Sequence, residues 1–158
     1  MEVLLNKGEY KPFTLEQSIQ IVKKLLALFY VNNINVIRVG LQATEDIQVG
    51  KAVVDGPHHP AFRELAESEM IKDYLIYIAK KYNIEKYITV KTNKKNVSKI
   101  IGNKKSNSTY MKNKLKINLK TKEEDIDIND LEIVLDDNKS IKINMNDIYS
   151  SLYNIYNL

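Results

Sequence analysis

The residue types best suited to contact phosphate gather around one glycine in the second half of the chain. In the segment "SKIIGNKKSNSTYMKNKL", the run Gly102, Asn103, Lys104 and Lys105 interrupts a helical pattern. A glycine lets the backbone approach a ligand closely, and lysine side chains bind phosphate oxygens. The pattern predicts nucleic-acid contacts at these four residues and at four flanking lysines: Lys95, Lys99, Lys112 and Lys114. The alternative is an ordinary solvated turn in a lysine-rich protein.

Charge is distributed unevenly along the 158 residues, although the net charge is only +4. Residues 1–84 carry ten basic and ten acidic side chains, whereas residues 85–122 carry twelve lysines and one acid. Residues 123–138 then carry eight acids and no base. A basic block of this size indicates an anionic partner such as RNA. The acidic block lacks the central glycine of a calcium-binding loop, so we expect a solvated loop that can pair with the basic block.

Two residues near the end of the apolar run "INVIRVGLQ" are candidates for contact with a substrate. We expect this run to form a buried strand over residues 34–41, with Arg38 inside it and Gln42 just after its C-terminal end. Parallel α/β proteins place ligand-contacting residues at the C-terminal ends of strands. A salt bridge from Arg38 to Glu45 or Asp46 is an equally weighted alternative.

A pair of adjacent histidines ends the loop that follows this run. His58 and His59 stand in "GPHHP", directly before a helical pattern. Neighbouring side chains on an extended segment point apart, and no third ligand accompanies them at helical spacing. We therefore expect the histidines to help cap the helix that begins near Pro60, close to a substrate, and we expect no metal site.

The sequence contains no cysteine. This excludes disulfides, thiolate nucleophiles and cysteine-ligated clusters within the chain. There is no apolar run of the roughly 20 residues that a membrane helix needs, and the N-terminus lacks the pattern of a signal peptide. We therefore expect a cytoplasmic protein.

Periodicity predicts the elements that would position these residues. In the first half, a helix over residues 14–31 has a capping box formed by Thr14 and Gln17, and a second helix runs from about Pro60 to Tyr82. The second half is predicted to contain a strand at "YITVKT", two short helical segments around Gly102, a strand at "KINLKT", a hairpin, and a final helix capped by Asn146. We expect two domains, residues 1–84 and 85–158, of α/β class.

The order strand, helix, loop, helix, strand in the second half resembles a KH module. In such modules a GXXG loop between two helices clamps the backbone of a few single-stranded nucleotides. Here Lys105 occupies the place of the second glycine. The resemblance implies a small lysine-rich, RNA-binding α+β domain.

Three blocks of the first half carry a second resemblance. The segments "GEYKPFTLEQSIQIVKKLLALF", "NNINVIRVGLQ" and "VVDGPHHPAFRELAESEM" look like the C-terminal region of radical S-adenosylmethionine (SAM) proteins related to the Elongator catalytic subunit and to oxygen-independent coproporphyrinogen oxidases. The resemblance implies a helix–strand–helix extension that packs on a radical-SAM catalytic barrel.

This resemblance also implies cofactors, but only for a region upstream of this chain. The family binds S-adenosylmethionine and a [4Fe–4S] cluster, and it ligates the cluster through CxxxCxxC, whereas this chain has no cysteine. We therefore expect a non-catalytic accessory portion, either a fragment of a longer protein or a partner of a separate catalytic chain, which contributes binding of RNA such as tRNA. The alternative is a protein–protein interaction or dimerisation module without a nucleic-acid role.

Overall fold

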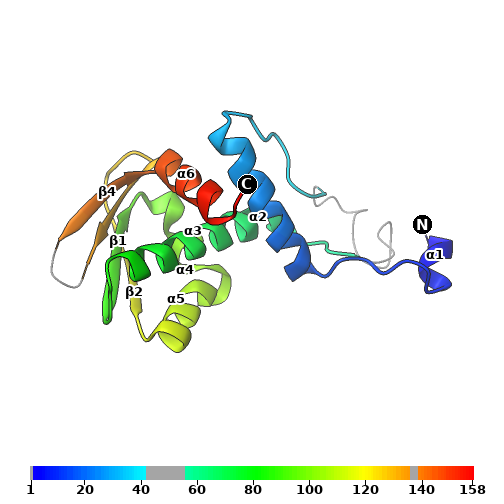
Figure 1. Cartoon of the computed structure of the whole chain (residues 1–158), viewed down its shortest axis with the longest axis horizontal. Coiled ribbons are helices and arrows are strands. Elements are labelled where there is room, and N and C mark those ends of the chain that lie inside the picture. Colours follow the sequence, from blue (N-terminus) through cyan, green and yellow to red (C-terminus); the bar gives the residue numbers. More distant parts are fainter. Residues whose placement is uncertain (1, 42–55, 136–138) are drawn as a thin grey trace.

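The computed structural model describes residues 2–41, 56–135 and 139–158. The chain forms a mixed α/β structure in which helices pack against a four-stranded sheet, as predicted for the fold class (Figure 1). The helices are α1 (Glu2–Asn6), α2 (Leu15–Val31), α3 (Phe62–Lys81), α4 (Val97–Ile101), α5 (Ser106–Tyr110) and α6 (Met145–Ile155). The strands are β1 (Tyr87–Thr92), β2 (Asn118–Glu123), β3 (Asp130–Val134) and β4 (Ser140–Asn144).

The sheet has the strand order β2-β1-β3-β4. Strands β1 and β2 are parallel neighbours, whereas β3 is antiparallel to both β1 and β4. A parallel pair requires a crossover connection, and here α4 and α5 supply it. The loop between these two short helices is therefore held by two paired strands. Single-turn helices extend this crossover: η1 (Lys94–Asn96), η2 (Asn103–Lys105) and η3 (Met111–Leu115).

Helices α2 and α3 confirm the two helices that periodicity predicted for the first half. Thr14 caps α2, because its hydroxyl accepts the N–H of Gln17 at 3.1 Å while the Gln17 side chain accepts the N–H of Thr14 at 2.9 Å. The cap predicted for the last helix is wrong by two residues. Asn144, with an extended backbone, caps α6 in place of Asn146, and Asp147 completes its capping box.

One hydrophobic cluster runs through the structure from α2 to α6. It contains fully buried side chains on each side of residue 85, including Leu26, Leu75, Ile88, Ile133 and Leu152. Helix α3 packs against α2, α4, α5 and α6, and Figure 1 shows it alongside these helices. The sheet buries the alternate residues of β1 against this layer. The domain boundary at residue 85 stays a prediction.

The strand predicted for residues 34–41 is not formed. This segment is extended but belongs to no sheet of the described residues, and Ile37 is 89% exposed. Ile34 and Leu41 are also more than half exposed. An apolar run indicates a preference for burial, but a strand also needs a partner for its backbone groups. Within the described residues the helix–strand–helix unit is therefore a helix, an extended segment and a helix.

No helix in the described ranges has the length and apolar character needed to cross a membrane.

Candidate nucleic-acid interface

The loop between α4 and α5 has a backbone that only glycine fits at its first position. Gly102 has φ of +83°, and a Cβ there would lie 2.4 Å from the Ser106 Oγ and 2.7 Å from the Asn107 nitrogen. Both distances are below any tolerable contact, and the close backbone atom cannot move aside as a side chain can. Gly102 therefore allows the two helices to approach each other, whereas the approach of a ligand to its backbone stays a prediction.

The loop lysines adopt the left-handed conformation. Lys104 has φ of +50° and Lys105 has φ of +62°, while the Lys105 N–H donates to the Gly102 carbonyl at 2.9 Å. Left-handed backbone costs a non-glycine residue roughly 1–2 kcal/mol. Lys105 thus takes the backbone shape that a glycine at this position would adopt without strain, and it adds a positive charge.

A buried asparagine fixes the loop and its helices to α3. Asn107 is 1% exposed, and its Nδ2 donates to the carbonyl and to the Oγ of Ser68, both at 3.0 Å. The same amide reaches the Ile100 carbonyl at 3.2 Å. The Ser68 hydroxyl in turn donates to the Lys99 carbonyl at 2.8 Å. Sequence reasoning missed Asn107 and Ser68, because nothing in a polar run such as "SNST" indicates which member is buried.

The predicted RNA-contacting lysines do not share one environment. Lys104 and Lys105 are exposed in the loop itself, whereas Lys112 and Lys114 are exposed in η3, beyond the end of α5. Within the described part of the chain no ion pair involves these four lysines. Lys95 is also exposed but lies in η1, at the end of α4 opposite the loop. Lys99 differs from all of these, because its Nζ lies 2.6 Å from a carboxylate oxygen of Glu67.

Glu67 on α3 is the centre of a polar network. Its Oε1 accepts the Tyr30 hydroxyl at 3.1 Å and the Arg63 Nε at 2.9 Å, while its Oε2 faces Lys99. Arg63 also donates to the Val36 carbonyl at 3.0 Å, which holds the extended segment against α3. Burial raises the pKa of Glu67, but the hydrogen bonds from Lys99 and Arg63 outweigh burial and lower the pKa overall.

The acidic block pairs in part with the basic block, as expected. Lys91 lies 3.1 Å from Glu132 across strands β1 and β3, and Lys122 lies 2.9 Å from Glu124. Each lysine lowers the pKa of its partner carboxyl. These pairs lie in or directly beside the strands, so the charges of Lys104 and Lys105 are left available for other partners.

The candidate substrate contacts of the first half are only partly described. Arg38 is exposed on the extended segment, while Gln42, Glu45 and Asp46 lie outside the described residues. His59 sits at the start of α3, where its Nδ1 accepts the Ala61 N–H at 3.1 Å and its carbonyl accepts the Phe62 N–H. His59 thus contacts the residues at the start of α3, but the N-cap residue of that helix is Ala61, which makes no side-chain capping bond.

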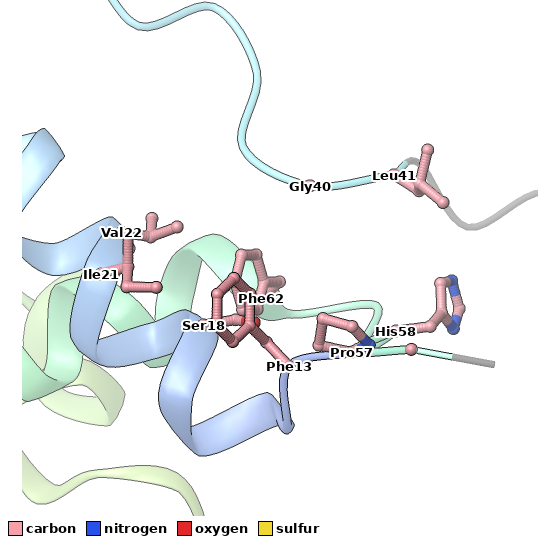
Figure 2. Close-up of a pocket in the computed structure, with 10 residues that line it drawn as sticks. Phe13, Ser18, Ile21, Val22, Gly40, Leu41, Pro57, His58 and Phe62 are labelled. Atoms are coloured by element: carbon pink, nitrogen blue, oxygen red, sulfur yellow. The ribbon is translucent and has the colours of Figure 1, made fainter. Parts of the chain in front are cut away.

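An apolar cavity of about 460 Å³ lies between α2, the end of the extended segment at Gly40 and Leu41, and the residues that lead into α3 (Figure 2). The cavity is lined by the apolar side chains of Phe13, Ile21, Leu41 and Phe62. His58 also lines it, and the Nε2 atom of this histidine is buried. This nitrogen has no hydrogen-bond partner among the described residues. The two histidines therefore have different surroundings, and no group of three His, Asp or Glu residues in the described ranges is placed to hold a metal ion.

The fold and site together define an α/β protein with a lysine-rich helix–loop–helix crossover joined to a helical N-terminal part. Residues 1–72 match the family model described as the Radical_SAM C-terminal domain. The N-terminal part is thus supported as the C-terminal region of a radical SAM protein. Comparisons with curated proteins and with solved structures found no match.

The cofactor of radical SAM chemistry does not fit the residues of this chain. A [4Fe–4S] cluster is held by cysteine thiolates, and the 158 residues include none. No step of that chemistry can therefore be assigned to the side chains described, and the match indicates an accessory part of such a protein.

Proposed function

We propose that the chain is the accessory, cluster-less C-terminal portion of a radical SAM protein of the Elongator type, and that residues 85–122 bind RNA such as tRNA. In this proposal the first part supports a catalytic barrel, present in the same chain or in a separate one. The second part acts as a KH-like module that clamps a single-stranded backbone. The chain itself performs binding, and the reaction belongs to the barrel.

The observation that carries the RNA-binding proposal is the geometry of the loop at residues 102–105. Gly102 brings the backbone of α4 close to α5, and two lysines in left-handed conformation stand exposed beside it. Clamps of the KH type use a loop between two helices to hold about four nucleotides. The order β1, α4, loop, α5 and β2 is also the order of elements on which the KH resemblance rests.

Support for a barrel partner comes from the apolar surface of the matched region. The exposed large apolar side chains in residues 3–41 are Val3, Leu4, Tyr10, Phe13, Ile21, Leu25, Ile34, Ile37 and Leu41. Helix α2 even buries Lys23 on its inner side while it leaves Ile21 and Leu25 more than 40% exposed. Exposed apolar surface of this extent is typical of a protein–protein contact.

The RNA proposal is tested by fluorescence anisotropy with labelled tRNA and single-stranded RNA over a range of salt concentrations. The variant Lys104→Glu/Lys105→Glu should weaken binding at least tenfold. The matched control Lys7→Glu/Lys11→Glu changes the net charge equally at two exposed positions near the N-terminus, and it should retain most of the affinity. Undetectable binding of the wild type at low salt, or equal losses in both variants, would refute the proposal.

The second candidate is a protein interaction or dimerisation module without a nucleic-acid role. It is favoured by the Lys91–Glu132 and Lys122–Glu124 pairs, which neutralise part of the basic block internally. This candidate predicts that sedimentation shows concentration-dependent association and that added RNA changes nothing. It is excluded if the protein stays monomeric and binds RNA.

A further inference from the structure

A second cavity joins the lysine-rich region to the family-matched region. It has a volume of about 440 Å³ and lies where α4 meets the beginning of α3 and the extended segment. Lys99 from α4 and Arg63 from α3 line it together with Val39. The carboxylates of Glu64 and Glu67 line the same cavity, so its positive and negative charges are balanced in the free protein.

One carboxylate holds both cations of this cavity. Glu67 is only 14% exposed in its side chain, and its two oxygens lie 2.6 Å from the Lys99 Nζ and 2.9 Å from the Arg63 Nε. A phosphate group offers the same kind of anionic oxygens and forms charge-assisted bonds with lysine and arginine. It can therefore replace Glu67 as the acceptor, provided that it can reach the cavity.

The position of Lys99 places such a phosphate near the loop. Lys99 stands three residues before Gly102, which is about 5 Å along a helix. Its side chain is 31% exposed, so Lys99 is accessible from solvent although it is paired. Arg63 then leads to the extended segment, because it holds the Val36 carbonyl two residues from the exposed Arg38.

We infer that the RNA surface continues from the loop over Lys99 into this cavity, where a backbone phosphate displaces Glu67 from Lys99. The inference rests on the proposed RNA binding and adds a path to it. This path runs from the loop at residues 102–105 toward the extended segment at residues 34–41, which lies within the family-matched region. Glu67 is the internal competitor of the RNA at this position.

The variant Glu67→Gln tests the competition. It removes the charge that neutralises Lys99, so affinity for single-stranded RNA should rise severalfold, and the slope of log K against log salt should steepen by about 0.7, the value for one added phosphate contact. Glu16→Gln is the matched control, because it makes the same charge change at an exposed position on α2. Adding Lys99→Gln to Glu67→Gln should return the slope to that of the wild type. Equal slopes for Glu67→Gln and Glu16→Gln would overturn the inference.

A crosslinking experiment tests the path without disturbing the network. Because the chain has no cysteine, a single introduced cysteine is a unique attachment point for an azidophenacyl photo-crosslinker. Val39→Cys in the cavity and Asn103→Cys in the loop should both crosslink bound RNA, whereas Ser140→Cys on strand β4 should not. Circular dichroism spectra should show that each variant is folded.

The outcomes of the crosslinking experiment separate the two claims. If position 103 crosslinks and position 39 does not, RNA binds only at the loop; the path is then wrong while the proposed function stands. If neither position crosslinks, both the path and the proposed function fail.

Discussion

The substitution Lys105→Gly separates the backbone shape of the loop from its charge. Lys105 has φ of +62°, and a non-glycine residue in this conformation carries roughly 1–2 kcal/mol of strain. Glycine removes the strain but loses about 0.5–1 kcal/mol because its unfolded chain is more flexible. At the middle of both ranges, the expected net gain in the free energy of unfolding is about 0.75 kcal/mol, together with a loss of RNA affinity because one charge has gone.

Urea and thermal denaturation followed by circular dichroism measure the stability, and anisotropy at several salt concentrations measures the RNA affinity. A gain of this size should raise the melting temperature by about 1–4 °C for a chain of this length. The salt slope for RNA should become shallower by about 0.7.

Two matched variants control for charge and for flexibility. Lys105→Ala removes the charge and keeps the strain, so it should weaken RNA binding as Lys105→Gly does but without the gain in stability. Lys112→Gly, in the helical turn η3, should lose about 1 kcal/mol because its backbone has no left-handed strain to relieve. If Lys105→Gly destabilises the protein as much as Lys112→Gly, the left-handed loop does not exist in solution and the reasoning is wrong.

Three further predictions concern the surroundings of the loop. Gly102→Ala should lower the free energy of unfolding by at least about 2 kcal/mol in urea denaturation, because the added Cβ meets the Asn107 backbone; an unchanged midpoint would contradict the described loop. Asn107→Ala should lower the free energy of unfolding by about 1–3 kcal/mol and weaken RNA binding, since the Ser68 hydroxyl and nearby carbonyls lose their buried hydrogen-bond partner. Unchanged stability together with unchanged binding would argue against the hydrogen bonds between Asn107 and Ser68. Folding lowers the pKa of Glu67 below 4.5, so its contribution to stability is present above about pH 4.5 and is lost as the pH falls through the folded value. The stability difference between wild type and Glu67→Gln should therefore shrink below pH 4.5 in urea titrations, and a difference independent of pH would contradict the ionised pair.

Local patterns predicted the elements that local physics determines. The capping box at Thr14 and the apolar spacing behind it identified α2, and the alternating apolar residues of "YITVKT" identified β1. The break at Gly102 was also predictable, because a glycine among lysines ends a helical pattern. These features depend on neighbours within a few residues of each other.

What the sequence could not predict depends on distant partners. The apolar residues of segment 34–41 indicated burial, but the segment's own residues do not determine whether another strand lies beside it. Lys99 looked like the other lysines, and only the packing of α4 on α3 brings it to Glu67, 32 residues away in the chain. Asn144 and Asn146 are both reasonable caps, and the extended backbone at Asn144 decides between them.

The hydrogen bonds between Asn107 and Ser68 have a consequence for the order in which parts of the chain fold during synthesis. Ser68 leaves the ribosome 39 residues before Asn107, so α3 can be formed before the amide that it receives has been synthesised. The helical segments around the loop are short, α4 with five residues and α5 with five residues continued by η3, and helices of this length are unstable in isolation because helix nucleation is costly. They are therefore expected to take shape during translation only by docking on α3, so that any delay in forming α3 also delays the loop.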